Sequence, residues 1–318
     1  GRPTFGVFET AEEDGNMETF LLCPGQGAQS IGMGRVWSEA NTTVRDTLSE
    51  ADSLLGDQLG QPLTTLCFEG PEASLHQTNV AQPALFAVGV AVWRALVEQG
   101  HQLSGAAGLS LGEYTALVAA GAMDFADGLR VVAERGRLMQ DAAVARAGGM
   151  VAVIGAEDDV VAQLASDAAQ GGVLSCANFN APGQVVIAGD SDACDRAEAL
   201  AAERGMRCSR LSVAGAFHSE HMAPAAEGLA KVLESVDVRA PSVPVWSNVT
   251  AQPHSSESST IRSNLVAQLT SPVRWAESCQ NFPAAGTLEF HESAPGTVLR
   301  GLMRRIDRER KVTSHDEP

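Results

Sequence analysis

The residues with the clearest chemical potential lie in the stretch Gly108-Leu109-Ser110-Leu111-Gly112. This G-x-S-x-G pattern stands between small apolar residues and a helical pattern that begins at Tyr114. The order strand, tight turn and helix is that of a nucleophile elbow, in which a strained serine exposes its oxygen at a helix start. Glycines on both sides let strand and helix approach closely. The same pattern also arises by chance in chains rich in Gly and Ser, so it needs support from other segments.

A serine nucleophile needs a base, and His218 is the first candidate. It ends the segment Ala214–His218, between a strand-like run and a helical pattern that starts near Ser219. The dipole of a helix N-terminus disfavours imidazolium, so a histidine there stays neutral and accepts a proton. His221 is a competing candidate that we interpret as a surface or packing residue. A capping or packing role for His218 is about as compatible with this pattern as catalysis.

An oxyanion needs backbone N–H donors, and the Gly-rich turn Pro24-Gly25-Gln26-Gly27-Ala28-Gln29 offers them. It follows the apolar run 20–23 and precedes a helical pattern. Such turns expose N–H groups that bind anions. A phosphate loop of the P-loop type would require a lysine, which this turn lacks. An oxyanion site is therefore the functional interpretation, and an ordinary strand–helix turn is the alternative.

Arg135 stands on the apolar face of a helix predicted over 127–143. The polar stripe of that helix consists of Arg130, Glu134, Arg137 and Asp141, and Arg135 is not on it. An inward-facing arginine needs a partner because an unpaired buried charge is costly. The pattern alone slightly favours a structural salt bridge with an Asp or Glu. The functional alternative is a guanidinium that binds a substrate carboxylate through two hydrogen bonds.

Composition excludes several classes of protein. The chain has 318 residues, 44% hydrophobic, and a formal net charge of −17. That balance argues against nucleic-acid binding. The six cysteines are scattered without a C-x-x-C pair, so we expect reduced thiols of an intracellular protein and no metal site. No apolar run reaches membrane-spanning length by inspection, so no membrane segment is expected.

The order of elements predicts an α/β fold in two parts. Residues 149–212 follow the order βαββαβ, which is typical of a ferredoxin-like unit. We expect this unit to be inserted into a large α/β-hydrolase-like subdomain, residues 17–148 and 213–312, with a mostly parallel sheet. Residues 1–16 are expected to be a flexible leader and 313–318 a disordered tail.

One basic stripe stands out on this acidic chain. Arg300, Arg304 and Arg308 recur at helical spacing near the C-terminus. A solvated helix face is the favoured interpretation, since cations suit a helix C-terminus. A docking surface for an acidic partner is the alternative.

Together these segments carry a family resemblance. The chain resembles the malonyl-CoA:acyl carrier protein transacylases and, more broadly, the acyltransferase domains of fatty-acid and polyketide synthases. The resemblance covers about residues 19–306. It depends on PGQGAQ at 24–29, Gln-Pro-Ala at 82–84, GLSLGEY at 108–114, ERGRLMQ at 134–140, NFNAPGQVVIAG at 178–189, GAFH at 215–218, SNV at 247–249 and QLTSPVRW at 268–275.

The resemblance implies a role for each motif. It implies Ser110 as nucleophile, His218 as base, and the backbone N–H groups of Gln26 and Leu111 as the oxyanion hole. It implies Arg135 as the clamp for the malonyl carboxylate. A backbone carbonyl near Gln268 orients the His ring in this family, so no third acidic residue is required. The remaining residues implied at the substrate are Phe217, which is associated with malonyl preference, Gln82, Asn180 and Gln268.

The implied reaction transfers malonyl from malonyl-CoA to the phosphopantetheine thiol of acyl carrier protein through an ester on Ser110. The implied substrates are malonyl-CoA and acyl carrier protein, with no bound cofactor or metal and a monomeric enzyme. A polyketide acyltransferase, a serine esterase or thioesterase, and a non-catalytic carrier-protein-binding module are the alternatives. The bacterial cytoplasm and the plastid or mitochondrial matrix are both compatible locations.

Two departures from the family pattern stand at the site. Leu109 occupies the position before the nucleophile where the family usually has His. Glu292-Ser293-Ala294-Pro295-Gly296 stands where E-V-G-P-G is usual. We expect activity to survive the first change and the loop to form despite the second.

Overall fold

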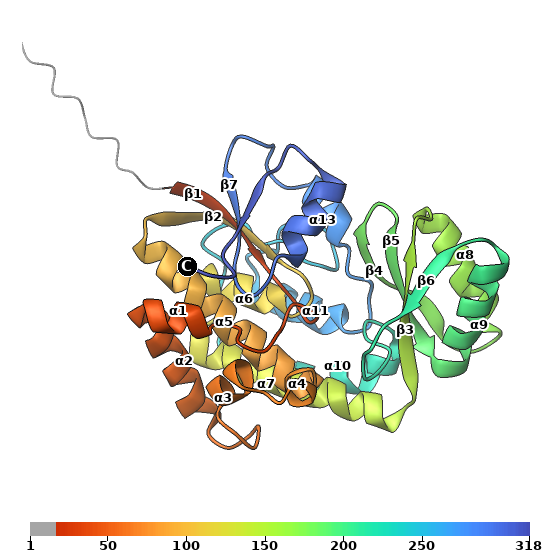
Figure 1. Cartoon of the computed structure of the whole chain (residues 1–318), viewed down its shortest axis with the longest axis horizontal. Coiled ribbons are helices and arrows are strands. Elements are labelled where there is room, and N and C mark those ends of the chain that lie inside the picture. Colours follow the sequence, from red (N-terminus) through yellow and green to blue (C-terminus); the bar gives the residue numbers. More distant parts are fainter. Residues whose placement is uncertain (1–16) are drawn as a thin grey trace, which may run out of the picture.

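The computed structural model describes residues 17–318, and the predicted leader at 1–16 lies outside the described residues. Two sheets form two units that lie side by side (Figure 1). The larger unit contains both the first described strand and the C-terminus.

The large sheet is parallel throughout. It consists of β1 (Met17–Cys23), β2 (His101–Gly108), β7 (Glu289–Glu292) and β8 (Val312–Ser314), in the order β2-β1-β7-β8. A parallel sheet is covered on both faces, so its strands are continuous apolar runs. The central strand β1 fits this rule, because Phe20 through Cys23 are all fully buried.

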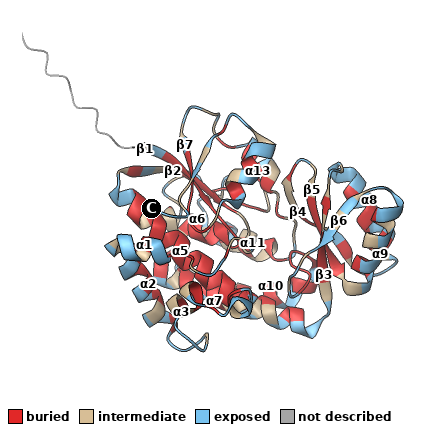
Figure 2. Cartoon of the chain, viewed as in Figure 1, coloured by how far each residue is buried: buried red, intermediate tan, exposed pale blue. Residues whose placement is uncertain are grey.

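Helices cover the large sheet, and one of them forms the centre of the core. Helix α5 (Thr78–Glu98) is long and apolar enough to cross a membrane by length and composition, with a mean hydropathy of 1.6. The expectation that no run reaches that length is therefore wrong. The helix lies inside the protein, with 89% of its apolar window buried (Figure 2), because it packs between α2 (Thr42–Leu55), α7 (Phe125–Ala145) and the sheet.

The other helices of the large unit are mostly short. They are α1 (Arg35–Ala40), α3 (Leu63–Phe68), α4 (Glu72–Leu75), α6 (Gly112–Ala119), the 3₁₀ turn η1 (Glu220–Met222), α10 (Ala223–Glu234), α11 (Ser258–Gln268), α12 (Trp275–Gln280) and α13 (Val298–Ile306). The segment 244–249 pairs with the large sheet through a single bridge, from Val245 to Ala106 of β2.

The small unit is the predicted ferredoxin-like βαββαβ. Its elements are β3 (Gly148–Ile154), α8 (Asp158–Ala169), β4 (Leu174–Ala181), β5 (Gln184–Asp190), α9 (Ser191–Glu203) and β6 (Arg207–Arg210). The sheet is antiparallel in the order β4-β5-β3-β6. The predicted fold class, a large α/β subdomain with a small ferredoxin-like one, is confirmed.

Side chains alternate along β3, so one face of the small sheet packs against helices and the other faces a cavity. Val151 and Val153 pack with α8 and α9 in one apolar cluster on the outer face (Figure 1). Met150, Ala152 and Ile154 point the other way and line a cavity between the two units. Alternation along one strand therefore supplies both a core and a cavity wall.

The expected disordered tail is wrong at residues 313 and 314. Val312–Ser314 forms β8, which pairs with β7 at the edge of the large sheet. The hydroxyl of Ser314 donates to Glu292, and the indole N–H of Trp37 donates to the carbonyl of His315 at 2.7 Å. Partners distant in the sequence thus order a segment that has no local pattern of its own.

The basic stripe is also shorter than predicted. Helix α13 ends at Ile306, so Arg308 lies beyond it and does not continue the helical spacing. Arg304 and Arg305 are exposed on the last turn, and Arg300 is half-buried.

Candidate active site

The elbow has the strained geometry that its sequence predicts. Ser110 lies between β2 and α6 with φ 54°, in the left-handed region that residues other than Gly rarely adopt. A Cβ on Gly112 would stand 2.1 Å from the carbonyl oxygen of Cys23, and a Cβ on Gly108 would stand 1.9 Å from the Gly112 backbone. Glycine at both positions is therefore required for strand and helix to come this close.

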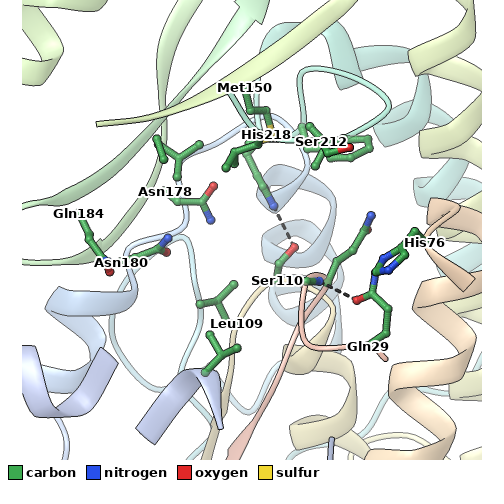
Figure 3. A pocket seen from close by; sticks show the side chains of 18 of the residues that line it. Gln29, His76, Leu109, Ser110, Met150, Asn178, Asn180, Gln184, Ser212 and His218 are labelled. Carbon is green, nitrogen blue, oxygen red and sulfur yellow. Dashed lines mark hydrogen bonds between the residues drawn. The ribbon is translucent and has the colours of Figure 1, made fainter. Parts of the chain in front are cut away.

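Ser110 and His218 lie within hydrogen-bond distance although 108 residues separate them. The Ser110 Oγ is 2.9 Å from His218 Nε2 (Figure 3). The other ring nitrogen, Nδ1, is 2.8 Å from the backbone carbonyl oxygen of Gln268. That carbonyl accepts an N–H, so Nδ1 carries the proton and Nε2 faces the serine as an acceptor.

The neutrality of His218 has a different cause from the predicted one. The pKa of the imidazole is lowered to about 4, mainly because the ring is buried, with a smaller contribution from the Arg135 charge. The hydrogen bond to Gln268 acts in the opposite direction. The expected helix N-terminus is displaced, since η1 is a single turn and α10 begins only at Ala223.

His221, the competing histidine, lies outside the site. Its Nε2 is 2.7 Å from Asp190, and its side chain is fully buried. The residue thereby connects η1 to the end of β5, which fits the packing role that we assigned to it.

Arg135 is buried at the bottom of the site, and the salt bridge that its pattern slightly favoured is absent among residues 17–318. Its guanidinium donates to uncharged oxygens instead: Nη1 to Gln82 Oε1 at 2.7 Å and Nη2 to Gln268 Oε1 at 2.7 Å. Nη2 also lies 3.2 Å from the Ser110 Oγ. The buried Nε has no partner among the described residues. Nε and Nη2 form one edge of the guanidinium, which is the edge that a carboxylate binds with two bonds.

Two backbone N–H groups near Ser110 are available to a ligand. Within residues 17–318, neither the N–H of Gln26 nor that of Leu111 donates to a protein acceptor. The turn at 24–29 is held by the Gln26 side chain, which donates to Thr78, and by the bond from the Gly27 N–H to Gln29. Both donors belong to turns beside the serine, as an oxyanion hole requires.

A cavity of about 1020 Å³ opens above the serine between the two units. Figure 3 shows Ser110 and His218 on one side and Asn178, Asn180 and Gln184 of the small sheet on the other. Phe217 also lines the cavity, and the Oδ1 of Asn180 is buried without a partner in the described chain. Gln82 and Gln268 lie behind the wall and contact Arg135.

Comparison with known proteins agrees with this geometry. The family model described as "Acyl transferase domain" matches residues 19–313. The malonyl CoA-acyl carrier protein transacylase of Bacillus subtilis is 40% identical over 300 residues, which cover 94% of this chain and 93% of that protein. The chain belongs to the acyl transferase family.

Solved structures extend the similarity to the whole fold. The malonyl-CoA:acyl carrier protein transacylase of Xanthomonas oryzae is 43% identical, with a TM-score of 0.89 over 95% of this chain and 96% of that one. A malonyl-transacylase in complex with its type II polyketide acyl carrier protein is 39% identical, with a TM-score of 0.88 over 95% and 96% of the two chains.

Asn248 is a residue of the acyl transferase site to which the sequence assigned no role. Its Oδ1 accepts the Ser110 N–H at 2.7 Å, and its Nδ2 donates to the carbonyl of Gly108 at 2.7 Å. It thereby holds both sides of the strained turn. Its only signal in the sequence is its place in the SNV motif.

Leu109 also has a place in this acyl transferase. Its side chain lines the cavity and packs against an apolar cluster of the large unit, which contains Phe20 and Trp246. A hydrocarbon therefore covers the cavity floor where the family usually has an imidazole.

The second departure keeps the loop that we expected. The carboxylate of Glu292 accepts the N–H groups of Leu299 and Arg300, so it caps α13. The Ser293 hydroxyl donates to the carbonyl of Gly89. The retained Glu292 thus anchors the loop to the helix, and the changed residue Ser293 anchors it to the core.

Residues 17–318 contain no group of three His, Cys, Asp or Glu side chains that could hold a metal ion. The six cysteines are all free thiols.

Proposed function

We propose that this acyl transferase moves the malonyl group of malonyl-CoA to the phosphopantetheine thiol of an acyl carrier protein. The observation that carries the proposal is the position of the Ser110 Oγ, 2.9 Å from an imidazole and 3.2 Å from a buried guanidinium. A nucleophile beside a carboxylate-binding cation suits an acyl group with a free carboxylate at its far end. The names of the relatives support the same substrates.

In the first half-reaction, the His218 Nε2 takes the Ser110 proton while the oxygen attacks the malonyl thioester carbon. The N–H groups of Gln26 and Leu111 stabilise the negative oxygen of the tetrahedral intermediate. The C–S bond then breaks, and the imidazolium returns its proton to the CoA thiolate. In the second half-reaction, the carrier thiol gives its proton to His218 and attacks the Ser110 ester, and serine leaves with that proton.

Arg135 supplies selectivity in this proposal. Its Nε and Nη2 bind the malonyl carboxylate with two charge-assisted bonds, and Gln82 and Gln268 fix the plane of the guanidinium. Phe217 and Asn180, which line the cavity, contact the acyl–pantetheine part of the substrate.

The carrier protein would approach over α13, where Arg300 and Arg304 stand beside the cavity-lining residues Val298 and Leu302. These cations would pair with an acidic carrier on a chain whose own charge is −17. The relatives named above are bacterial where an organism is given, which favours the bacterial alternative for location. A monomer remains our prediction.

Mass spectrometry of the protein with malonyl-CoA tests the proposal. A malonyl adduct on Ser110 that carrier protein discharges faster than water supports a transferase. Rapid hydrolysis without carrier protein would support the esterase alternative. Fatty-acid and polyketide carrier proteins compared side by side would separate the two pathways, and Ser110→Ala serves as the control without a nucleophile.

A further inference from the structure

Gln268 connects the base and the guanidinium of this site. Its backbone oxygen faces His218, and its side-chain Oε1 accepts from Arg135 at 2.7 Å. Its Nε2 lies 3.1 Å from the backbone oxygen of Ser110. The orientation of this one amide therefore determines the direction of the guanidinium edge that faces the serine.

A buried carboxylate lies behind that amide. Glu113 is 1% exposed, and its Oε1 accepts the backbone N–H of Asn248 at 2.8 Å and an N–H of Gln268 at 3.3 Å. Its Oε2 lies 2.8 Å from the Nε2 of His254, whose side chain is fully buried. Glu113 thus contacts both residues that hold the serine turn and the clamp.

The Glu113 carboxylate contacts His254 although a buried guanidinium, that of Arg135, is in the same site. A buried charge needs a partner, and the buried guanidinium of Arg135 is an obvious one. In residues 17–318, Glu113 makes no ion pair with Arg135 and pairs with His254 instead. Tyr114 covers the guanidinium, with the Arg135 Cζ 5.4 Å from its ring centroid. Within the described residues the guanidinium has no carboxylate partner and its Nε is unpartnered, so its charge is available to a ligand.

We propose that Glu113 and His254 form a positioning pair for the carboxylate clamp. Glu113 fixes the Gln268 amide, and His254 holds the Glu113 carboxylate away from Arg135. The inference rests on the proposed function, because it concerns the site that binds the malonyl carboxylate. Without His254, the carboxylate turns toward Arg135 and competes with the acyl carboxylate. Without Glu113, Gln268 loses its fixed direction.

The test compares malonyl-CoA with acetyl-CoA as donors for acylation of Ser110. His254→Ala is expected to raise the KM for malonyl-CoA about tenfold. Its kcat with malonyl-CoA, and its kcat and KM with acetyl-CoA, should change much less. Glu113→Ala is expected to lower the malonyl-to-acetyl ratio of kcat/KM by about tenfold or more. Glu113→Gln keeps an oxygen acceptor for Asn248 and Gln268, so it is expected to recover most of that ratio.

His101→Gln is the matched control for stability. His101 is also a buried, hydrogen-bonded histidine, 2.8 Å from Thr19, but it begins β2 at the end opposite the elbow. This control is expected to lower Tm without moving the malonyl-to-acetyl ratio. If Glu113→Ala fails to fold, His254→Ala and Glu113→Gln decide, since the pair predicts a lower ratio in the first and near recovery in the second.

The inference would be overturned if the malonyl-to-acetyl ratio of kcat/KM in His254→Ala stayed within about twofold of the wild-type ratio, whatever the change in Tm. Failure of the proposed function is distinguishable, because the wild-type protein would then form no malonyl ester on Ser110.

Discussion

The Nδ1 of His218 lies 2.8 Å from the backbone carbonyl oxygen of Gln268, so an uncharged group orients the imidazole. A carboxylate in that place would stabilise the imidazolium and raise the pKa of the ring. With a carbonyl there, burial dominates, and the pKa is lowered to about 4.

The first prediction concerns the pH profile of acylation. Because the base acts when neutral, kcat/KM should stay constant from pH 8 down to about 5 and fall as the pH drops through about 4. Rapid-quench acylation of Ser110 from acetyl-CoA measures it. The Arg135 charge lowers this pKa, so Arg135→Ala should move the acid limb to higher pH. An acid limb near the ordinary histidine pKa in the wild type would contradict the argument.

The second prediction concerns donor selectivity. Arg135→Ala should reduce malonyl transfer by a factor on the order of 10² and largely spare acetyl transfer, since only the malonyl group carries a carboxylate. Arg135→Lys should recover little, because an ammonium does not reproduce the two-bond edge. Arg137→Ala on the same helix removes an exposed ion pair with Glu134 and serves as the control. Unchanged selectivity in Arg135→Ala would refute the clamp.

The third prediction concerns Asn248. Asn248→Ala removes the acceptor of the Ser110 N–H and the donor to Gly108, so it should lower the free energy of unfolding by about 1–3 kcal/mol and also slow acylation. Asn248→Asp keeps the acceptor but puts a carboxylate oxygen against the Gly108 carbonyl in a buried place, so it should not restore stability. Denaturant titration and single-turnover acylation provide the two measurements. The assignment fails if acylation is unaffected in the alanine variant.

The fourth prediction concerns the glycines of the elbow. Gly112→Ala should prevent soluble folding, because its Cβ would overlap the backbone of β1 at 2.1 Å from the Cys23 oxygen. Gly301→Ala is the comparison, since nothing lies within 4 Å of its Cβ and it stands inside helix α13. This change should stabilise the protein by about 0.5–1 kcal/mol in thermal unfolding. A soluble Gly112→Ala enzyme would show that strand and helix can separate.

The fifth prediction concerns acid stability and the C-terminal strand. His315 stands 2.8 Å from His291, and burial, with the neighbouring His291 and His101, lowers its pKa to about 4. The unfolded chain binds this proton near pH 6.5, so stability should be lost as the pH falls from about 6.5 to about 4 and then level off. His218 acts in the same direction.

His315→Gln separates the two histidines. It should flatten the loss of stability between pH 6.5 and 4 while His218 still contributes. Urea unfolding at each pH gives the slope. If the slope in this variant equals that of the wild type, His315 does not contribute.

Local patterns were enough for the main architecture. The strand–turn–helix at Ser110, the βαββαβ order and the inward position of Arg135 are all properties of contiguous segments, and the structure has all three. Local patterns failed where partners are distant. The strand β8 has too few residues to show a period, and it exists because β7 pairs with it and Trp37 binds the next residue, His315.

The hydrogen-bond partners of Arg135 also could not be predicted from local patterns, because they are distant in the sequence. Its helix shows that the side chain is buried, but Gln82 and Gln268 stand 53 and 133 residues away. The pattern alone therefore favoured an acidic partner, which is the commoner solution for a buried cation.

The strained elbow at Ser110 follows from local sequence alone, because the glycines that permit the turn, Gly108 and Gly112, lie two residues away on either side. The sequence also determined which residue types are present to form a site. How these residues meet depends on the packing of distant segments: burial keeps His218 neutral, Asn248 holds the serine turn, and Glu113 pairs with His254 and not with Arg135. Burial and long-range hydrogen bonds depend on packing between segments that the chain order keeps apart, so no local pattern contains them.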